Sequence, residues 1–369
     1  MNYRCLLLFF TLIFLTNSYS QESEEKLTFL EQLKIPINTR LDFRYLNYEN
    51  NSTDLPDDAR FQFSYFKIDV LGNVVENLNF RVRYSPVTST IGTSGISNVI
   101  QLANLNYLTK NKRWYFELGK SFLKLGTVEE QYLGADVYSW SIIARNVEVY
   151  RTGFTSEYRF GNNQGIGFQI LNGNLNENNA VQSLEYNLFW FGEIGEIGDA
   201  FFSATAIIGP NQNTTPYTLN GGVQWKLGSY RLDTDAAIMY NFRNFYPETL
   251  YYSFPVQLAR VEGKWSPTFK YIYNIVNPLK EIEIDYRGEQ VRLEQATLHT
   301  VSGGIQYFPI PEKNLRFHLV TSYSFDEDVV NYAPPIEDPG NTKIGYNAAF
   351  QIILGVRIDF DVLHGLRYR

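Results

Sequence analysis

The chain has 369 residues, a formal net charge of −7 and an aromatic content of 16%, with 27 tyrosines and 27 phenylalanines against 2 methionines. The acidic balance argues against nucleic acid as a partner, and no apolar run after Leu15 approaches the length of a membrane-spanning helix. The single cysteine, Cys5, lies near the N-terminus, so the sequence after it can form neither a disulfide nor a thiolate metal site.

The N-terminus is organised like a secretory signal peptide. Arg4 is the only charge before the apolar run Leu6–Leu15, and small polar residues follow as far as Ser20. The apolar run is too short for a membrane anchor, which needs about twenty residues. We therefore expect residues 1–20 to be a signal peptide that is cleaved on export.

Residues 21–36 are polar at first and then change character. Leu27, Leu30 and Leu33 recur at helical spacing, and Pro36 ends the pattern. We expect this stretch to be a short periplasmic N-terminal segment.

From residue 37 onward, apolar and polar side chains alternate over stretches of about ten residues almost everywhere. In Ile37–Asn47, for example, isoleucine, leucine, phenylalanine and tyrosine alternate with asparagine, arginine and aspartate. This alternation predicts strands whose two faces meet different surroundings, and ten residues is the length of a tilted strand that crosses hydrocarbon. Near Tyr65 the alternation shifts by one residue, which predicts a β-bulge.

The connections between these stretches alternate in length. Those at residues 72–77, 109–113, 161–164 and 308–314 are short, whereas those at residues 47–60, 86–98 and 326–343 are long and polar. A hairpin of two such strands with one turn and one loop takes roughly 44 residues, which allows about sixteen strands. We therefore predict an all-β fold: a transmembrane antiparallel β-barrel over residues 37–369, with about 16 strands (range 14–18), short periplasmic turns and long extracellular loops.

Charged residues on these strands are expected to face the inside of the barrel, because lysine or arginine facing lipid costs a few kcal/mol. The predicted pore-lining residues are Arg40, Asp42, Arg44, Arg81, Arg83, Arg357, Asp359 and Asp361. Arginines two residues apart lie about 6.5 Å apart on one face and could pass an anion along the wall. Alternatively, the arginines pair with the aspartates and form a solvated wall.

The stretch Trp114–Asn174 contains an aromatic strand that ends in Leu-Gly-Lys at 118–120, a loop over residues 121–146, and a strand pair that ends in Asn-Gly at 172–173. In these elements the chain resembles the phosphate-selective porin O and P family. The resemblance implies a sixteen-stranded porin of the bacterial outer membrane, usually trimeric. It also implies that the loop around 121–146 folds into the lumen and sets a constriction, and that basic side chains along the channel attract anions.

The candidate constriction residues carry both charges: Lys120, Lys124, Glu129, Glu130, Asp136 and Arg145. Converging basic residues would favour a multiply charged anion, whereas the acidic ones would favour cations or sugars. An anion or phosphate preference is therefore left open.

The histidines offer little support for an enzyme. His299, His318 and His364 are the three in the chain, and a barrel hydrolase would need one of them beside a serine. His299 and Ser302 fall on opposite faces of a strand. No cluster of acidic residues and histidine has metal-ligand spacing, so we expect no catalytic residues, no metal and no cofactor.

The sequence thus predicts an outer-membrane porin, through which small hydrophilic solutes or ions diffuse passively, in contact with outer-membrane lipids and with a homotrimer as the candidate assembly. The alternative is a non-conducting outer-membrane barrel that serves as a binding or assembly platform through its long loops.

Overall fold

The computed structural model describes residues 32–48, 58–86, 99–132, 134–161, 163–173, 183–209, 215–242, 248–280, 283–286, 289–292, 295–310, 315–326 and 349–362. The predicted signal peptide and most of the predicted N-terminal segment lie outside these residues, as does His364. Among the described residues, none of the helices has the length and apolar character needed to cross a bilayer.

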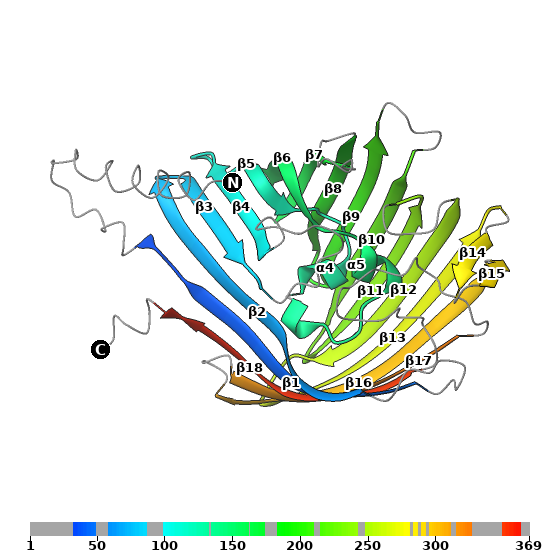
Figure 1. Cartoon of the computed structure of the whole chain (residues 1–369). Coiled ribbons are helices and arrows are strands. Elements are labelled where there is room, and N and C mark those ends of the chain that lie inside the picture. The colour runs from blue at the N-terminus through cyan, green and yellow to red at the C-terminus, as the bar shows by residue number, and fades with distance from the viewer. Residues whose placement is uncertain are drawn as a thin grey trace. The chain divides into compact units, whose positions relative to one another are not determined.

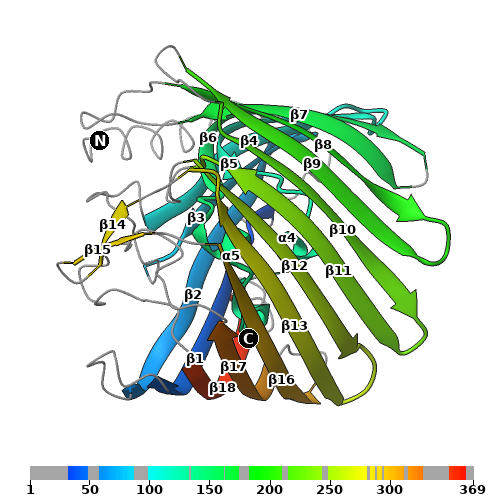
Figure 2. The same cartoon turned by 90° about the vertical axis from the view of Figure 1, so that its right-hand side faces the viewer.

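Sixteen strands close into an antiparallel barrel in which neighbours in sequence are neighbours in space (Figures 1 and 2). The barrel strands are β1 (Pro36–Tyr48), β2 (Asp58–Val75), β3 (Leu78–Tyr84), β4 (Ile100–Leu108), β5 (Trp114–Phe122), β6 (Tyr150–Phe160), β7 (Gln164–Asn172), β8 (Leu184–Ile194), β9 (Gly198–Ile208), β10 (Tyr217–Leu227), β11 (Tyr230–Tyr240), β12 (Thr249–Arg260), β13 (Trp265–Pro278), β16 (Ala296–Ile310), β17 (Leu315–Asp326) and β18 (Ala349–Asp361). A separate hairpin, β14 (Glu283–Tyr286) with β15 (Glu289–Arg292), interrupts the connection from β13 to β16. The predicted fold class and strand number are confirmed.

Short turns and long connections alternate around the barrel, as the sequence predicts. The turn between β10 and β11 consists of Gly228 and Ser229, and Gly228 has a φ of 63°, which glycine adopts without strain. The turn predicted at residues 72–77 is shorter than expected, because the pairing of β2 with β3 continues to Val75 and Leu78.

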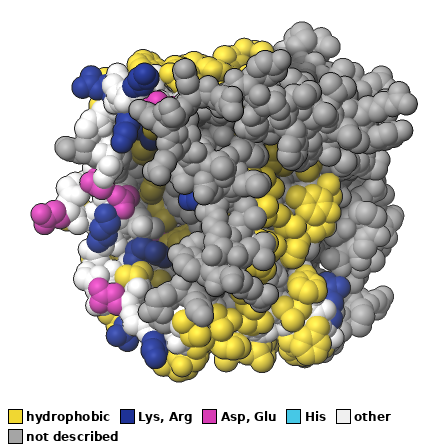
Figure 3. Space-filling model, turned by 90° about the vertical axis from the view of Figure 1, so that its left-hand side faces the viewer, with side chains coloured by type: hydrophobic (Ala, Val, Ile, Leu, Met, Phe, Trp, Pro, Cys, Tyr) yellow, Lys and Arg dark blue, Asp and Glu magenta, His cyan; other side chains and the backbone are white. Residues whose placement is uncertain are grey.

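The two faces of each strand differ in burial. On β18, Leu354 and Phe360 are about half exposed on the outer face, whereas Arg357 between them is buried on the inner face. Figure 3 shows one face of the molecule, where hydrophobic side chains form broad patches and most charged side chains lie toward the left edge. This is the division expected of a barrel with hydrocarbon outside and water inside.

The bulge predicted near Tyr65 is confirmed. Arg40 of β1 pairs with Tyr65 and Leu41 pairs with Phe63, so Ser64 is the extra residue. Phe63 before the bulge is exposed on the outer face, whereas Tyr65 after it is buried. The bulge therefore lets one long strand keep its apolar side chains outside on both sides of the parity change.

The connection from β5 to β6, residues 123–149, lies inside the barrel and is called the lumen loop here (Figure 2). It contains the helices α4 (Val128–Gln131) and α5 (Ile142–Asn146) and the 3-10 turn η1 (Gly134–Asp136). Its buried apolar side chains pack against apolar inner-wall residues of β7, β9, β11, β12, β13 and β16. The cluster comprises Leu123, Leu125, Ile142, Ile143, Val147, Leu171, Ile207, Ala237, Met239, Phe242, Tyr251, Val276, Ala296 and Leu298. One side of the lumen is thus filled by a hydrophobic core.

The outer face should tolerate charge poorly. Leu188, exposed on the outer face in the middle of β8, changed to Arg should lower the free energy of unfolding in lipid vesicles by about 2–4 kcal/mol. Thr268→Arg, on the inner face beside a cavity, is the control and should cost less than Leu188→Arg. Urea unfolding in vesicles measures both. Equal losses would contradict the assignment of faces.

Candidate functional site

The lumen loop is held against the inner wall by polar side chains from successive strands. On β7, the carbonyl oxygen of the Gln169 side chain accepts the N–H of Lys124 at 2.9 Å. On β8, Asn187 donates to the Lys124 carbonyl at 2.8 Å, and on β9 the Ser203 hydroxyl donates to the Leu125 carbonyl. These side chains therefore supply hydrogen-bond partners to a backbone that is buried away from water.

The next wall contact depends on a gap left by glycine. Asp235 of β11 accepts the N–H groups of Val128 at 2.5 Å and Glu129 at 3.0 Å, at the start of α4. Its cross-strand partner is Gly222 of β10, where a Cβ would lie 2.0 Å from the Asp235 carboxylate. A side chain at position 222 would therefore displace the aspartate that holds α4.

Glu129, one of the predicted constriction residues, is buried and joins the loop to the wall. Its carboxylate accepts from Lys270 of β13 at 2.5 Å and from the Ser141 hydroxyl at 2.6 Å. Lys270 also donates to the Ser139 carbonyl at 2.7 Å. Glu129 therefore ties α4, the segment before α5 and β13 together rather than presenting a carboxylate to the pore.

Where the barrel closes, three arginines stand in a row across the inner face. Arg316 of β17 is the cross-strand partner of Arg357 of β18, and Arg357 is the partner of Arg40 of β1. Like charges directly opposite each other are destabilising. Asp42 forms an ion pair with Arg40 at 2.9 Å, and Asp359 accepts from Arg357 at 2.6 Å, so two of the three arginines have an acidic partner on their own strand.

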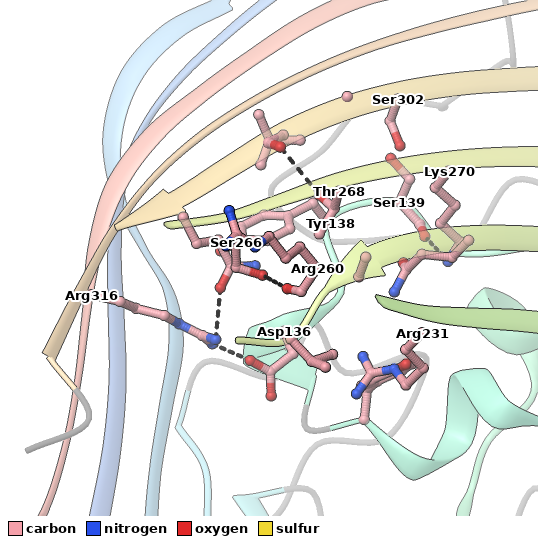
Figure 4. A pocket seen from close by; sticks show the side chains of 18 of the residues that line it. Asp136, Tyr138, Ser139, Arg231, Arg260, Ser266, Thr268, Lys270, Ser302 and Arg316 are labelled. Carbon is pink, nitrogen blue, oxygen red and sulfur yellow. Dashed lines mark hydrogen bonds and ion pairs between the residues drawn. The ribbon is translucent and has the colours of Figure 1, made fainter. Parts of the chain in front are cut away.

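The lumen loop supplies a third acid to this arginine row. Asp136 of η1 accepts from both Arg316 and Arg357, and Figure 4 shows Arg316 pointing toward it. The neighbouring Val137 carbonyl accepts from Arg40 at 3.5 Å. The tip of the loop, residues 134–139, is thus attached to the wall at β1, β17 and β18.

Tyr138 packs on the same part of the wall. Its ring lies 4.9 Å from the Arg40 guanidinium and 4.9 Å from the His318 ring. His318 in turn shares a 2.8 Å hydrogen bond with Asp42. These two residues lie on β17 and β1, and they meet across Gly355 of β18, where a Cβ would lie 2.4 Å from the carboxylate.

Two cavities lie on opposite sides of the loop tip, and both are lined by Tyr138 and Ser139. The cavity toward the short turns has a volume of about 470 Å³ (Figure 4). The other, toward the long connections, has a volume of about 520 Å³. The charged residues described around the first are Arg231, Arg260, Lys270, Arg316 and Asp136, and those around the second are Arg40, Arg44, Arg60, Arg145 and Asp42. Each cavity therefore has four basic residues and one acidic residue in its lining.

In several ion pairs of the inner wall, the acid is more buried than its basic partner. The side chain of Arg81 is 33% exposed and that of Asp69 only 3%, and Arg231 is 27% exposed against 5% for Asp233. Asp69 accepts from Arg83 as well, at 2.9 Å. The arginines 81 and 83 therefore share one acid, as in the paired-wall alternative, and it is the positive member that faces water.

The remaining predicted residues are spread over different places. Arg44 and Arg145 line the cavity toward the long connections. Lys124 and Glu130 line a third cavity of about 230 Å³, which α4 borders. Asp361 accepts from the Ile35 N–H at 3.5 Å, at the end of the last strand.

Lys120 is not brought into this group. It pairs with Ala103 and Thr152, and its neighbour Ser121 is buried on the inner face. Because successive strand residues point to opposite faces, Lys120 lies on the outer face of β5, the face of Leu118. The expectation that it contributes to a constriction does not agree with this register.

Several further residues of the inner wall were not among the predicted pore-lining residues, although the same alternation of residue types identifies them. Lys67 and Asp69 follow the bulge at alternate positions. Arg231, Asp233 and Asp235 alternate along β11, and Lys270, Arg316 and His318 each stand between apolar neighbours. Parity alone could have found them.

Glu130 is the acidic residue of the loop whose pKa is shifted. Its carboxylate accepts the Gly126 N–H at 2.9 Å, and Phe189, Phe191 and Phe201 line the same cavity. Burial raises the pKa of Glu130 to about 7, against the opposing attraction of Lys124.

The two described histidines contact aromatic and acidic side chains. His299 shares a 2.8 Å hydrogen bond with Tyr271 and stacks on Phe325, and His318 contacts Asp42 and Tyr138. Within the described ranges, His, Asp and Glu side chains form no group that could hold a metal ion.

The raised pKa of Glu130 predicts a pH dependence. The folded protein binds this proton more tightly than the unfolded chain, whose value is near 4.5, so stability should fall as pH rises from about 4.5 to 7. Glu130→Gln should flatten that part of the profile. Thermal unfolding in detergent at several pH values measures it, with Glu148→Gln, an exposed loop glutamate, as the control. An unchanged slope in Glu130→Gln would contradict the assignment.

Comparison with known proteins agrees with this architecture. The model of the family described as phosphate-selective porin O and P matches residues 34–193, a little less than half of the chain, and confirms the resemblance found in the sequence. The matched part covers β1 to β8 and the whole lumen loop. A comparison with curated proteins found no match.

Solved structures with the same fold include an anion-selective porin and outer-membrane proteins. The anion-selective porin from Comamonas acidovorans has a TM-score of 0.60 at 11% identity, over 89% of this chain and 99% of that chain. The trimer form of in-vitro folded OmpT from Vibrio cholerae has a TM-score of 0.57 at 12% identity, over 89% and 99%. OmpF of Salmonella typhi in complex with daunomycin has a TM-score of 0.56 at 12% identity, over 89% and 97%. The first eight strands of this chain therefore match the phosphate-selective porin O and P family, and the barrel as a whole has the fold of the outer-membrane porins.

Proposed function

We propose that the protein is an outer-membrane porin, which lets small hydrophilic solutes or ions diffuse passively through its barrel. The observation that carries this proposal is the pair of polar cavities on opposite sides of the loop tip, inside a closed barrel. Both are lined by Tyr138 and Ser139, so a path that joins them passes this segment of the loop. Passive diffusion through such a channel requires neither catalytic turnover nor a cofactor.

We further propose a preference for anions. Four basic residues and one acidic residue line each cavity, and acids such as Asp69 and Asp233 lie buried behind their arginines. A low-dielectric wall that shows mainly positive charge raises the local concentration of anions and lowers that of cations. The comparable porin of Comamonas acidovorans is described as anion-selective.

The proposed setting is the bacterial outer membrane, reached by export with a signal peptide at residues 1–20. There the apolar outer face of the barrel contacts lipid. Short turns would face the periplasm and long connections the exterior, as in other barrels of this kind.

The second candidate is a barrel that does not conduct and serves as a platform for binding or assembly. The hydrophobic core between the lumen loop and β7 to β16 favours it, because that core already fills one side of the lumen. The two candidates differ in whether the remaining polar path is open.

Planar-bilayer recording distinguishes the candidates. The purified protein should give ohmic single-channel steps, with a reversal potential in a potassium chloride gradient that reports preference for chloride. Arg231→Gln and Arg44→Gln should lower this preference, because each removes a positive charge from a cavity lining. Lys112→Gln, in the exposed turn between β4 and β5, removes the same charge elsewhere and should leave it unchanged. Absence of steps would favour the platform, and a preference for potassium would refute the anion proposal.

We also propose that the protein assembles as a homotrimer, as in the solved trimer form of OmpT from Vibrio cholerae, which shares its fold. Native mass spectrometry from mild detergent should show three copies of the chain. A monomer across a range of detergents that preserve the barrel's circular dichroism spectrum would contradict the proposal.

A further inference from the structure

We propose that Asp136 is a latch that fixes the width and the charge of the passage between the two cavities. This inference rests on the proposed channel function. It assigns a positioning role in that channel to one acidic residue, whose charge is opposite to that of the basic residues around it.

Three arginines in register make an acid at this place necessary. Arg316, Arg357 and Arg40 are successive cross-strand partners, and all three are buried. Arg357 has Asp359 as a partner, and Arg40 has Asp42. The remaining guanidinium, that of Arg316, bonds the neutral side chain of Gln306 at 2.9 Å and has its acidic partner in the loop.

Asp136 joins the end of this row to the loop. Its carboxylate accepts from Arg316 on β17, the contact drawn in Figure 4, and from Arg357 on β18, so one side chain bridges two strands. Such charge-assisted hydrogen bonds are about twice as strong as neutral ones. Around it, the Val137 carbonyl lies 3.5 Å and the Tyr138 ring 4.9 Å from Arg40, and the Ser139 carbonyl accepts from Lys270 at 2.7 Å. Asp136 is the one charged side chain of the tip, and it attaches the tip to two strands through ion pairs.

At this site the acid is more exposed than the arginines, as Asp359 also is beside Arg357. In the pair of Asp69 and Arg81, by contrast, the acid lies behind the arginine. Here the Asp136 side chain is 23% exposed, whereas those of Arg316 and Arg357 are 11% and 4% exposed. The carboxylate therefore lies between water and the two guanidinium groups, and it masks part of the positive charge of the wall.

The position of the latch links it to the passage. Asp136 lines the cavity toward the turns, and Tyr138, two residues later, lines both cavities. Releasing Asp136 would break the ion pairs of the tip with two strands and uncover two arginines. Both changes act on the part of the loop that lies between the cavities.

The test compares two variants that remove one carboxylate from the same arginine. Asp136→Asn breaks the bridge to the loop, whereas Asp359→Asn removes the partner of Arg357 on its own strand and leaves the loop attached. Single-channel recording should show larger conductance and stronger chloride preference for Asp136→Asn. Asp359→Asn should retain the wild-type conductance.

A second measurement follows the position of the loop tip and does not depend on channel current. Spin labels at Ser139→Cys and Arg113→Cys, the latter in the turn after β4, report the distance from the loop tip to the rim of the barrel. Adding Asp136→Asn should broaden this distance distribution, and adding Asp359→Asn should not. If the wild type did not conduct, the channel proposal would fail while the distance measurement still tested the latch. A wild-type distance distribution in Asp136→Asn, or equal broadening in both variants, would overturn the latch.

Discussion

Inside a membrane every backbone N–H and C=O of a strand must find a partner, and a sheet can satisfy this only by closing on itself. In this chain the closure is the pairing of β1 with β18, which runs from Pro36 with Asp361 to Tyr48 with Ala349. That register determines which side chains of β1 and β18 lie opposite each other. It sets the outward row of apolar side chains on both strands, and it brings Arg40 opposite Arg357 on the inner face. The arginine row is thus a consequence of closure, and the aspartates around it, including that of the loop, compensate for it.

The lumen loop depends on the same inner face. Its backbone is bonded to side chains that point inward from successive strands, and its apolar side chains cover the apolar inner positions between them. Gly222 and Gly355 act in the same way in this arrangement. Each leaves a gap through which a neighbouring carboxylate, Asp235 or Asp42, reaches a partner that strand geometry would otherwise block. A polar wall, small residues at two positions and one apolar core together hold a long connection inside a barrel.

The alternation of residue types is local, and it predicted what depends on local geometry: the barrel, the number of strands, the two faces and the bulge near Tyr65. Partners across the lumen depend on the register of strands that are far apart in the chain. Asp136 and Arg316 are separated by 180 positions, and Glu129 and Lys270 by 141, so no local pattern joins them. For the same reason Lys120 was placed in the constriction by proximity in sequence, although strand parity turns it outward.

The central claim is that one face of each strand meets water and the other meets lipid, with an open path past the loop tip. Cysteine modification during current recording tests it most directly. The only cysteine of the sequence, Cys5, lies in the predicted signal peptide, so an introduced cysteine would be the only thiol of the exported chain. Ser302, buried on the inner face of β16 beside the cavity toward the turns, is changed to Cys, and Ile305, exposed on its outer face, is changed to Cys in a second protein. A bulky charged thiol reagent should reduce the current through the first protein and leave that through the second unchanged. Block at position 305 without block at position 302 would contradict the account.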